Sequence, residues 1–387
     1  MTKRHDSIES LENGNWFKLI CGASFQHLPA VRNLVLAYTI AGADCIDVAA
    51  DRAVIKATKE AIKLAENSQS DRFETAKKPL LMVSINDGED PHFRKAEFDA
   101  KYCPEDCSRP CEKICPAAAI DFTSSEKTGT AIIADRCYGC GRCLPVCPIG
   151  IITTRSTQIE KAAIADEISE MGIDAIEIHT SIGNEKAFQE LWQAIYPQVE
   201  SLKLISISCG DGPDLIKYFK YIYETIAPLS IPLIWQTDGR PMSGDIGAGT
   251  THASIKLAQK VIEADLPGYV QLAGGTNHAT VSKIRALGLL KGKNEATKPE
   301  KLPSIAGVAY GSYARSLLLP ILEQLETREK FSPLQTSAPV RLEKYPDLLQ
   351  KATKLADSLV SQLKNKQKIC TLPEKFCTTQ PIDKNNI

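Results

Sequence analysis

The chain has 387 residues, of which 43% are hydrophobic and 24% charged, and its 46 basic residues nearly balance its 47 acidic ones. This balance gives no bulk electrostatic preference for nucleic acid or for an anionic membrane surface, so we expect neither as a partner. No apolar run approaches the roughly 18 residues of a membrane span, and no apolar leader follows Met1. We therefore expect a cytoplasmic protein with one large domain or two ordinary ones.

Residues 1–14 are polar, and we expect them to be loose. After them, short apolar runs alternate with segments of helical periodicity, which is typical of parallel strand pairing. The runs predict strands at 16–22, 45–50, 79–85, 173–179, 202–208, 231–236, 268–273 and 304–309. The intervening patterns predict helices at 28–41, 51–67, 158–171, 185–196, 214–226 and 278–287, with another after Thr250.

Eight strands separated by helices predict an α/β fold, a TIM-like (β/α)8 barrel, with an open doubly wound sheet as the alternative. The barrel is expected in two parts, 15–90 and 153–326. Residues 91–152 form an insert after the third strand, which places it on the C-terminal face of the barrel. Residues 327–387 are expected to form a C-terminal helix at about 345–363 and a flexible tail that contains Cys370 and Cys377.

The insert contains eight of the 13 cysteines. Residues 137–148 follow the pattern C-x2-C-x2-C-x3-C-P, which is the ligand pattern of bacterial two-cluster ferredoxins, and a looser C-x3-C-x3-C-x3-C-P run precedes it. The residues that follow Cys115-Pro116 are similar to those that follow Cys147-Pro148, 32 positions later. This similarity indicates a duplicated half-module. The ligands predicted by the two runs are Cys103, Cys107, Cys111, Cys115, Cys137, Cys140, Cys143 and Cys147.

In such proteins the fourth cysteine of a run serves the other cluster. We therefore expect one [4Fe–4S] cluster on Cys103, Cys107, Cys111 and Cys147, and a second on Cys115, Cys137, Cys140 and Cys143. The wider spacing of the first run leaves open a three-iron or altered cluster. Zinc is disfavoured because its sites usually use two separated C-x2-C pairs, and disulfides are disfavoured in a reducing compartment.

Glycine-bearing loops follow the predicted strands at 231–236, 268–273 and 304–309. In barrels of this type, the last two loops frequently bind phosphate through backbone N–H groups. Gly274, Gly275, Thr276, Gly311 and Ser312 are therefore candidates for an FMN or substrate phosphate site, with Arg240 or Arg315 as counter-charge. The alternative is that Thr276 or Asn277 simply caps a helix.

Other polar residues near the strand ends are candidates for the barrel mouth. His179, His252 and His278 are candidates for a general base, but a cap or a packed residue is the favoured interpretation of each taken alone. Asp47, Asp174 and Glu177 lie within strand patterns and are expected to line the mouth or to pair inside the barrel. Cys21, Cys45 and Cys209 belong to apolar strands and are interpreted as small buried hydrophobes.

The cysteine runs, together with residues 271–277 (QLAGGTN) and 307–315 (GVAYGSYAR), resemble the light-dependent period family of cyanobacteria over nearly the whole chain. The resemblance implies cluster binding at the cysteines above. It also implies a role in the input pathway of the circadian clock, in which redox state is reported to clock input and oscillator proteins. It assigns no catalytic residue.

Three functions remain open from the sequence. The first is a redox-sensing regulatory protein whose clusters respond to electron supply and are read by a partner. The second is an iron–sulfur oxidoreductase that passes electrons from a donor to a flavin or substrate at the barrel mouth. The third is a scaffold in which metal binding mainly folds the insert.

Overall fold

A computed structural model describes most of the chain. The described residues are 6–21, 27–67, 78–88, 94–115, 118–124, 129–134, 136–137, 139, 141–156, 168–240, 247, 249–290, 304–330 and 341–364.

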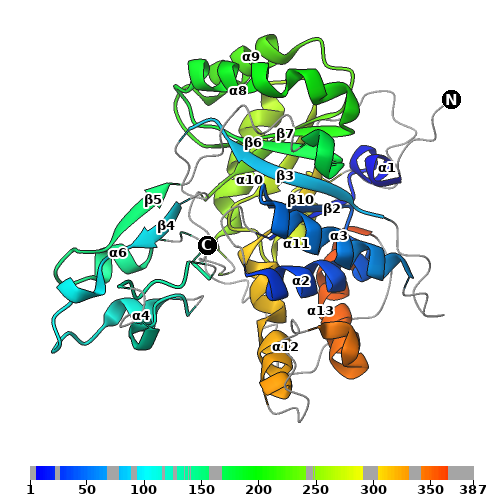
Figure 1. Cartoon of the computed structure of the whole chain (residues 1–387). Coiled ribbons are helices and arrows are strands. Elements are labelled where there is room, and N and C mark those ends of the chain that lie inside the picture. Colours follow the sequence, from blue (N-terminus) through cyan, green and yellow to red (C-terminus); the bar gives the residue numbers. More distant parts are fainter. Residues whose placement is uncertain are drawn as a thin grey trace, which may run out of the picture.

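Eight parallel strands close into a barrel, with the order β1-β10-β9-β8-β7-β6-β3-β2 around the ring (Figure 1). The strands are β1 (Trp16–Ile20), β2 (Cys45–Ala49), β3 (Leu80–Asn86), β6 (Ala175–His179), β7 (Leu204–Gly210), β8 (Leu233–Asp238), β9 (Tyr269–Ala273) and β10 (Ile305–Tyr310). All eight predicted strands are confirmed, and the closure excludes the open sheet.

Helices cover the outside of the barrel. They are α2 (Leu28–Ala41), α3 (Arg52–Asn67), α8 (Glu185–Ile195), α9 (Leu215–Ile226), α10 (Thr251–Glu263), α11 (Thr280–Ala286) and α12 (Ser312–Lys330). The helix predicted at 158–171 lies largely outside the described residues, and residues 168–171 are helical. None of the helices in the described ranges combines the length and the apolar composition that a bilayer crossing requires.

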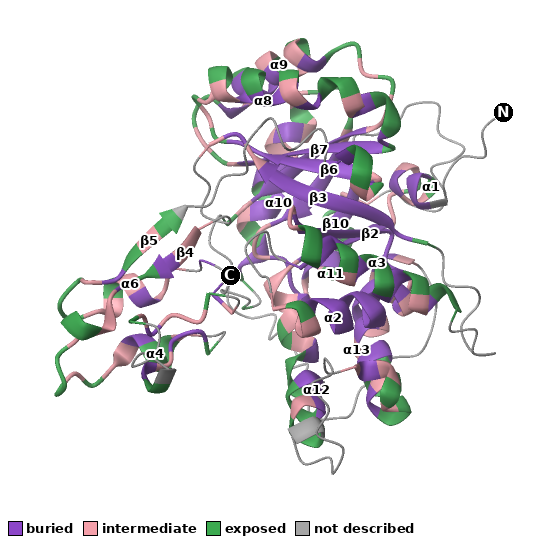
Figure 2. Ribbon diagram, viewed as in Figure 1, coloured by how far each residue is buried: buried purple, intermediate pink, exposed green. Residues whose placement is uncertain are grey.

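Alternation along the strands decides what faces the helices and what faces the barrel interior. In β7, Ile205 and Ile207 belong to the large core between strands and helices, whereas Leu204 belongs to a separate apolar cluster inside the barrel. Ser206 and Ser208 follow Leu204 at every second position and point the same way. The interior therefore changes from apolar to polar toward the C-terminal end of the strands, although both parts are buried (Figure 2).

A short helix, α1 (Asp6–Glu12), closes the N-terminal end of the barrel. Ile8 and Leu11 are buried against the interior cluster that contains Trp16 and Leu80. The expectation that residues 1–14 are loose is therefore wrong for this segment. Two apolar side chains three positions apart suffice here because the barrel supplies the rest of their apolar surroundings.

The C-terminal helix α13 (Pro346–Lys364) is confirmed and packs against α2 and α12. Its buried face joins the outer core, and Lys364 Nζ at its end contacts the Asp44 carboxylate. Just before the helix, the Glu343 carboxylate accepts hydrogen bonds from the Arg32 guanidinium at 2.6 and 2.8 Å. The predicted flexible tail, with Cys370 and Cys377, lies outside the described residues.

The insert projects from the barrel between β3 and β6, which remain paired neighbours (Figure 1). Its ends form a two-stranded antiparallel ribbon of β4 (Arg94–Glu97) and β5 (Thr153–Ser156). Short helices complete it, namely η2 (Ala100–Tyr102), α4 (Pro110–Ile114), η3 (Phe122–Ser124) and α6 (Cys143–Val146). A small core of its own, which includes Phe98, Ile120 and Ile152, packs beside the cysteines.

The role of α1 as a plug can be tested with Leu11→Ala. Leu11 is 1% exposed, and removing such a buried side chain should lower the free energy of unfolding by about 2–3 kcal/mol. Glu9→Ala, on the exposed face of the same helix, is the control and should have little effect. Guanidinium unfolding followed by tryptophan fluorescence measures both variants. A loss below about 0.5 kcal/mol for Leu11→Ala, the range of an ordinary surface change, would contradict the plug.

Candidate metal centre and barrel interior

The two cysteine runs fold as structural repeats. Helices α4 and α6 pack together, and each ends at a cysteine that precedes a proline, Cys115 and Cys147. The two cysteines have nearly the same backbone angles, with φ −72° and ψ 109° at Cys115 and φ −70° and ψ 114° at Cys147. Three residues further on, Ala118 and Gly150 both have positive φ, and each N–H donates to the carbonyl of its cysteine. The duplication predicted from the sequence is therefore also a duplication of backbone geometry.

The thiols of the first predicted group interact electrostatically. Burial raises the pKa of Cys103, and Cys107 and Cys111 raise it further. Burial also raises the pKa of Cys111, to which Cys147 and Cys107 add. The Cys111 thiol thus interacts with Cys107 and Cys147, but no three of the described cysteine, histidine or acidic side chains are gathered closely enough in this structure to hold a metal ion. Cys147, although it belongs to the second run in sequence, thus interacts electrostatically with Cys111 of the first run. The assignment of both cysteines to one cluster stays a prediction.

Members of the second predicted group line a pocket in the insert. Cys115, Cys137 and Cys143 line it, together with Gly139 and Gly141, which both have a φ of 71°. Cys140 lies outside the described residues. The structure therefore brings together the three described members of this group, and Cys115 comes from the first run.

Backbone N–H groups point at the sulfurs of both groups. Ala96 N–H donates to Cys137 Sγ at 3.3 Å, and Ala119 N–H donates to Cys115 Sγ at 3.3 Å. At Cys147, burial opposes ionisation, but a turn of backbone N–H groups that begins at Ile149 lowers the pKa below its ordinary value. Such donors stabilise sulfur that carries negative charge, which is the state of a cluster ligand.

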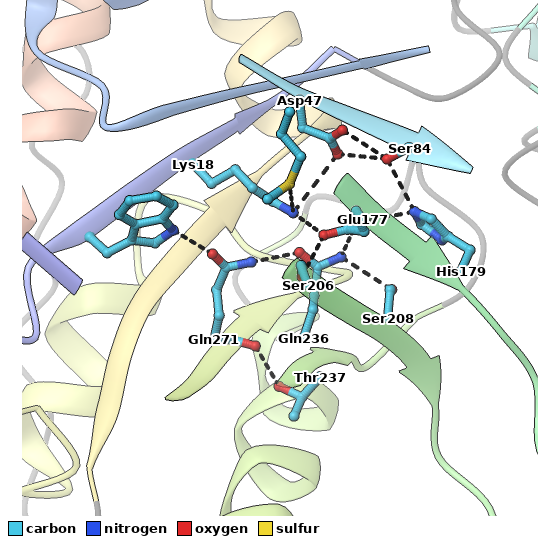
Figure 3. A network of polar contacts seen from close by, with 12 residues as sticks. Lys18, Asp47, Ser84, Glu177, His179, Ser206, Ser208, Gln236, Thr237 and Gln271 are labelled. Atoms are coloured by element: carbon cyan, nitrogen blue, oxygen red, sulfur yellow. Dashed lines mark hydrogen bonds and ion pairs between the residues drawn. The ribbon is translucent and has the colours of Figure 1, made fainter. Parts of the chain in front are cut away.

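The barrel interior contains a second concentration of polar groups, centred on Glu177 (Figure 3). Glu177 Oε2 accepts from Lys18 Nζ and, at 2.9 Å, from Ser206 Oγ. Glu177 Oε1 lies 2.7 Å from Gln236 Nε2 and 3.0 Å from His179 Nε2. Burial alone would raise the pKa of Glu177, but Lys18 and His179 lower it well below its usual range, so Glu177 is a carboxylate. All five residues are buried.

The network continues to both sides of Glu177. On one side, Trp16 Nε1 donates to Gln271, whose Nε2 donates to Gln236 Oε1, both at 2.6 Å. On the other, Ser84 Oγ donates to the Asp47 carboxylate at 2.8 Å and lies 3.4 Å from His179 Nε2. Burial raises the pKa of Asp47 to about 7, and Glu177 adds to the effect of burial.

The residues predicted to lie at the barrel mouth therefore do not all meet in one place. Asp47, Glu177 and His179 meet inside the barrel. Asp174 instead lies before β6, where its carboxylate accepts from Leu81 N–H at 3.0 Å and from Lys203 Nζ at 2.6 Å. The two remaining candidates for a general base, His252 and His278, are exposed on the loops and helices outside.

Sequence reasoning missed Lys18, Ser84, Ser206, Gln236 and Gln271 as members of one site. Each is a polar residue at an inward position of its strand, so alternation along the strand could indicate that it faces the interior but not that it meets the others. The predicted buried cysteines behave as expected, because Cys21, Cys45 and Cys209 are all buried.

The glycine loops are closely packed. A Cβ on Gly274 would lie 1.9 Å from Asp238 Oδ1, and one on Gly275 would lie 2.6 Å from Thr250 O. Thr276 Oγ1 donates to Ala309 O at 2.6 Å, and Ser312 Oγ accepts from Arg315 at 3.3 Å, close to Gly311. These contacts give the loop residues a structural role, and an FMN or phosphate at this position stays a prediction.

Residues 167–362 match the family described as the light dependent period A C-terminal domain, and residues 103–158 match its Fe-S cluster-binding domain. The chain is 47% identical over 357 residues to Light dependent period A of Synechococcus elongatus, covering 92% of this chain and 93% of that protein. This chain belongs to the light dependent period A family. The resemblance seen in the sequence is thereby confirmed.

An uncharacterized ferredoxin of Methanocaldococcus jannaschii is 32% identical over 76 residues, which cover 19% of this chain and 48% of that protein. Among solved structures, the tryptophan synthase alpha chain of Legionella pneumophila has a TM-score of 0.43 at 10% identity, with coverage of 94% and 99%. A truncated 3-deoxy-D-arabino-heptulosonate 7-phosphate synthase of Thermotoga maritima has a TM-score of 0.37 at 11% identity, with coverage of 90% and 89%. The barrel itself is established by the closed strand order.

The cysteines of this family member fit the iron–sulfur group that its cluster-binding domain implies. The described cysteines that are predicted as ligands offer thiols, N–H donors at the sulfurs of Cys115 and Cys137, and a pocket lined by three of them. An iron–sulfur cluster, when bound, supplies reversible one-electron transfer. The chain's own residues hold it, screen it from solvent and stabilise the charge on its ligand sulfurs.

The repeat geometry predicts opposite effects of two exchanges. Ala118 has φ 46°, a left-handed conformation that costs an L-residue roughly 1–2 kcal/mol, whereas Gly150 has φ 64° with nothing within 4 Å of an added Cβ. Ala118→Gly should therefore stabilise the insert by about 1 kcal/mol and Gly150→Ala should destabilise it by a similar amount.

The measurement is the half-life of iron–sulfur absorbance in guanidinium under anaerobic conditions. We expect a change of about fivefold in each direction, as about 1 kcal/mol implies. If Ala118→Gly shortens the half-life, as a glycine substitution ordinarily would, the matched geometry of the two repeats has no energetic weight.

Proposed function

We propose that this family member is a redox-sensing regulatory protein that holds two [4Fe–4S] clusters and relays the redox or light state of the cytoplasm to the circadian clock. The single observation that supports the proposal is the repeated cysteine geometry, in which both runs end in the same backbone turn at a Cys-Pro and N–H groups donate to the sulfurs of Cys115 and Cys137. The name of the Synechococcus relative, Light dependent period A, supports the link to light and period.

The two groups differ in exposure. In the first group Cys103, Cys107 and Cys147 are partly exposed and Cys111 is buried. In the second group Cys137 and Cys143 are buried and Cys115 is partly exposed, so the first group has more exposed thiols. Solvent exposure and hydrogen bonds to sulfur are among the factors that set cluster potential. The first centre is thus the one that meets a diffusing electron donor or acceptor, and the second is the one nearer to the ribbon that joins the insert to the barrel.

A redox sensor acts through a partner protein that distinguishes the states of its clusters. We assign this role to a circadian clock input or oscillator protein, which must contact one cluster state with a more favourable free energy than the other. The insert suits such a contact because it projects from the barrel and is joined to it through the β4–β5 ribbon (Figure 1).

Serine substitutions at neighbouring cysteines test the cross-ligation. Cys111→Ser and Cys147→Ser should alter one electron paramagnetic resonance signal of the reduced protein, while Cys115→Ser and Cys143→Ser alter the other. Anaerobically prepared protein should contain about eight iron and eight sulfide per chain, as two [4Fe–4S] clusters require. Zinc without sulfide would eliminate the redox function. If Cys111→Ser and Cys115→Ser alter the same signal, the two cysteines bind the same cluster and the cross-ligation is eliminated.

Capture of clock input and oscillator proteins tests the sensory role. Captured amounts should differ at least fivefold between dithionite-reduced and oxidised protein, and Cys147→Ser should remove the difference. Cys209→Ala changes a buried cysteine of β7 far from the insert in sequence and should leave the difference intact. Equal capture in both states would overturn the sensor, and flavin retained on gentle purification would instead favour the oxidoreductase.

A further inference from the structure

The polar interior reaches the C-terminal mouth of the barrel at Asn86 and His179. These residues are register partners at the ends of β3 and β6. Asn86 lies two residues after Ser84, and His179 lies two residues after Glu177. Both therefore continue the inward faces of their strands. His179 is 6% exposed and Asn86 is partly exposed. The opposite end of the interior is closed by the apolar cluster and α1.

Asn86 carries an unsatisfied acceptor. Its Oδ1 is shielded from solvent, and no donor in the described part of the chain reaches it. A buried amide oxygen without a donor is unfavourable and calls for an explanation. Because the Asn86 side chain is itself partly exposed, rotation of its amide presents this oxygen to a molecule that enters the mouth.

The charges beneath Asn86 indicate what kind of molecule this is. Lys18 and Glu177 form a buried ion pair, in which Glu177 and Asp47 raise the pKa of Lys18 against the effect of burial. The other two titratable groups of the network, Asp47 and His179, both contact Ser84 Oγ. If Asp47 and His179 share one proton, these four groups of the network sum to zero charge. A charged ligand would therefore bring an uncompensated charge into a buried site, which is costly.

We propose that the barrel mouth binds a small uncharged polar molecule, a polyol or a carboxamide, whose O–H or N–H donates to Asn86 Oδ1 beside His179. The site is separate from the cysteine groups, and it does not depend on the redox proposal. His179 is a positioning residue, because Glu177 and Ser84 fix its ring from below and thereby fix the wall against which the ligand packs.

The test uses the cluster-loaded full chain with isotope-labelled histidine, of which the chain has six residues. His179→Gln identifies the His179 signal by its loss. The uncharged probes are glycerol and acetamide, and acetate and methylammonium are the charged probes. We expect a saturable shift of the His179 resonance with at least one uncharged probe and at least tenfold weaker binding of both charged probes.

Asn86→Leu, which keeps the size but removes the acceptor, should weaken the uncharged probe at least tenfold. Asn15→Leu is the matched control, because Asn15 Oδ1 is also shielded and lacks a donor among the described residues, but precedes β1 at the opposite end of the barrel. It should titrate like the native protein.

Three results overturn the proposal, namely no saturable shift with either uncharged probe, an equal response to acetate or methylammonium, or native affinity in Asn86→Leu. If Asn86→Leu does not fold, the four titrations of the native protein still test the first two of these results. None of these results bears on the clusters, whose spectra test the redox function separately.

Discussion

The two-stranded ribbon of β4 and β5 is the constraint on which the joint structure of barrel and insert depends. Because β3 and β6 pair directly in the closed barrel, the inserted chain must leave and return at adjacent strands. Antiparallel pairing of residues 94–97 with 153–156 achieves this return. Ala96 within the ribbon also donates its N–H to Cys137 Sγ. One short ladder therefore preserves the barrel and anchors the second cysteine group.

Inside the barrel, an apolar layer and a buried polar layer have different roles. Barrel interiors are usually filled by branched apolar side chains, and buried ions cost several kcal/mol each unless hydrogen bonds compensate them. Here the apolar layer with Trp16 and Leu80 supplies packing at one end. Glu177, with hydrogen-bonding partners at both carboxylate oxygens, compensates Lys18 at the other. A layer this expensive to bury is better explained by a site than by stability.

The sequence was sufficient for what is encoded locally. Apolar runs predicted all eight strands, whereas the assignment of the cysteines to two clusters stays a prediction. Two features escaped it. Helix α1 has too few apolar residues to be recognised without the barrel end that it covers. The polar layer depends on strand register, which decides that Lys18, Glu177 and Gln236 lie at one height, and no local pattern contains that information.

The same geometry indicates where a redox signal would be expressed if the proposed function holds. An added electron changes the charge beside sulfurs whose donors are backbone N–H groups, and one of these donors belongs to β4. The closed barrel resists deformation, because each of its strands is paired on both sides and packed interiors are not continuously deformable. The ribbon and the insert have fewer constraints, since β4 and β5 pair only with each other. A change in cluster charge should therefore move the insert relative to a fixed barrel, and a partner that reads it should contact both.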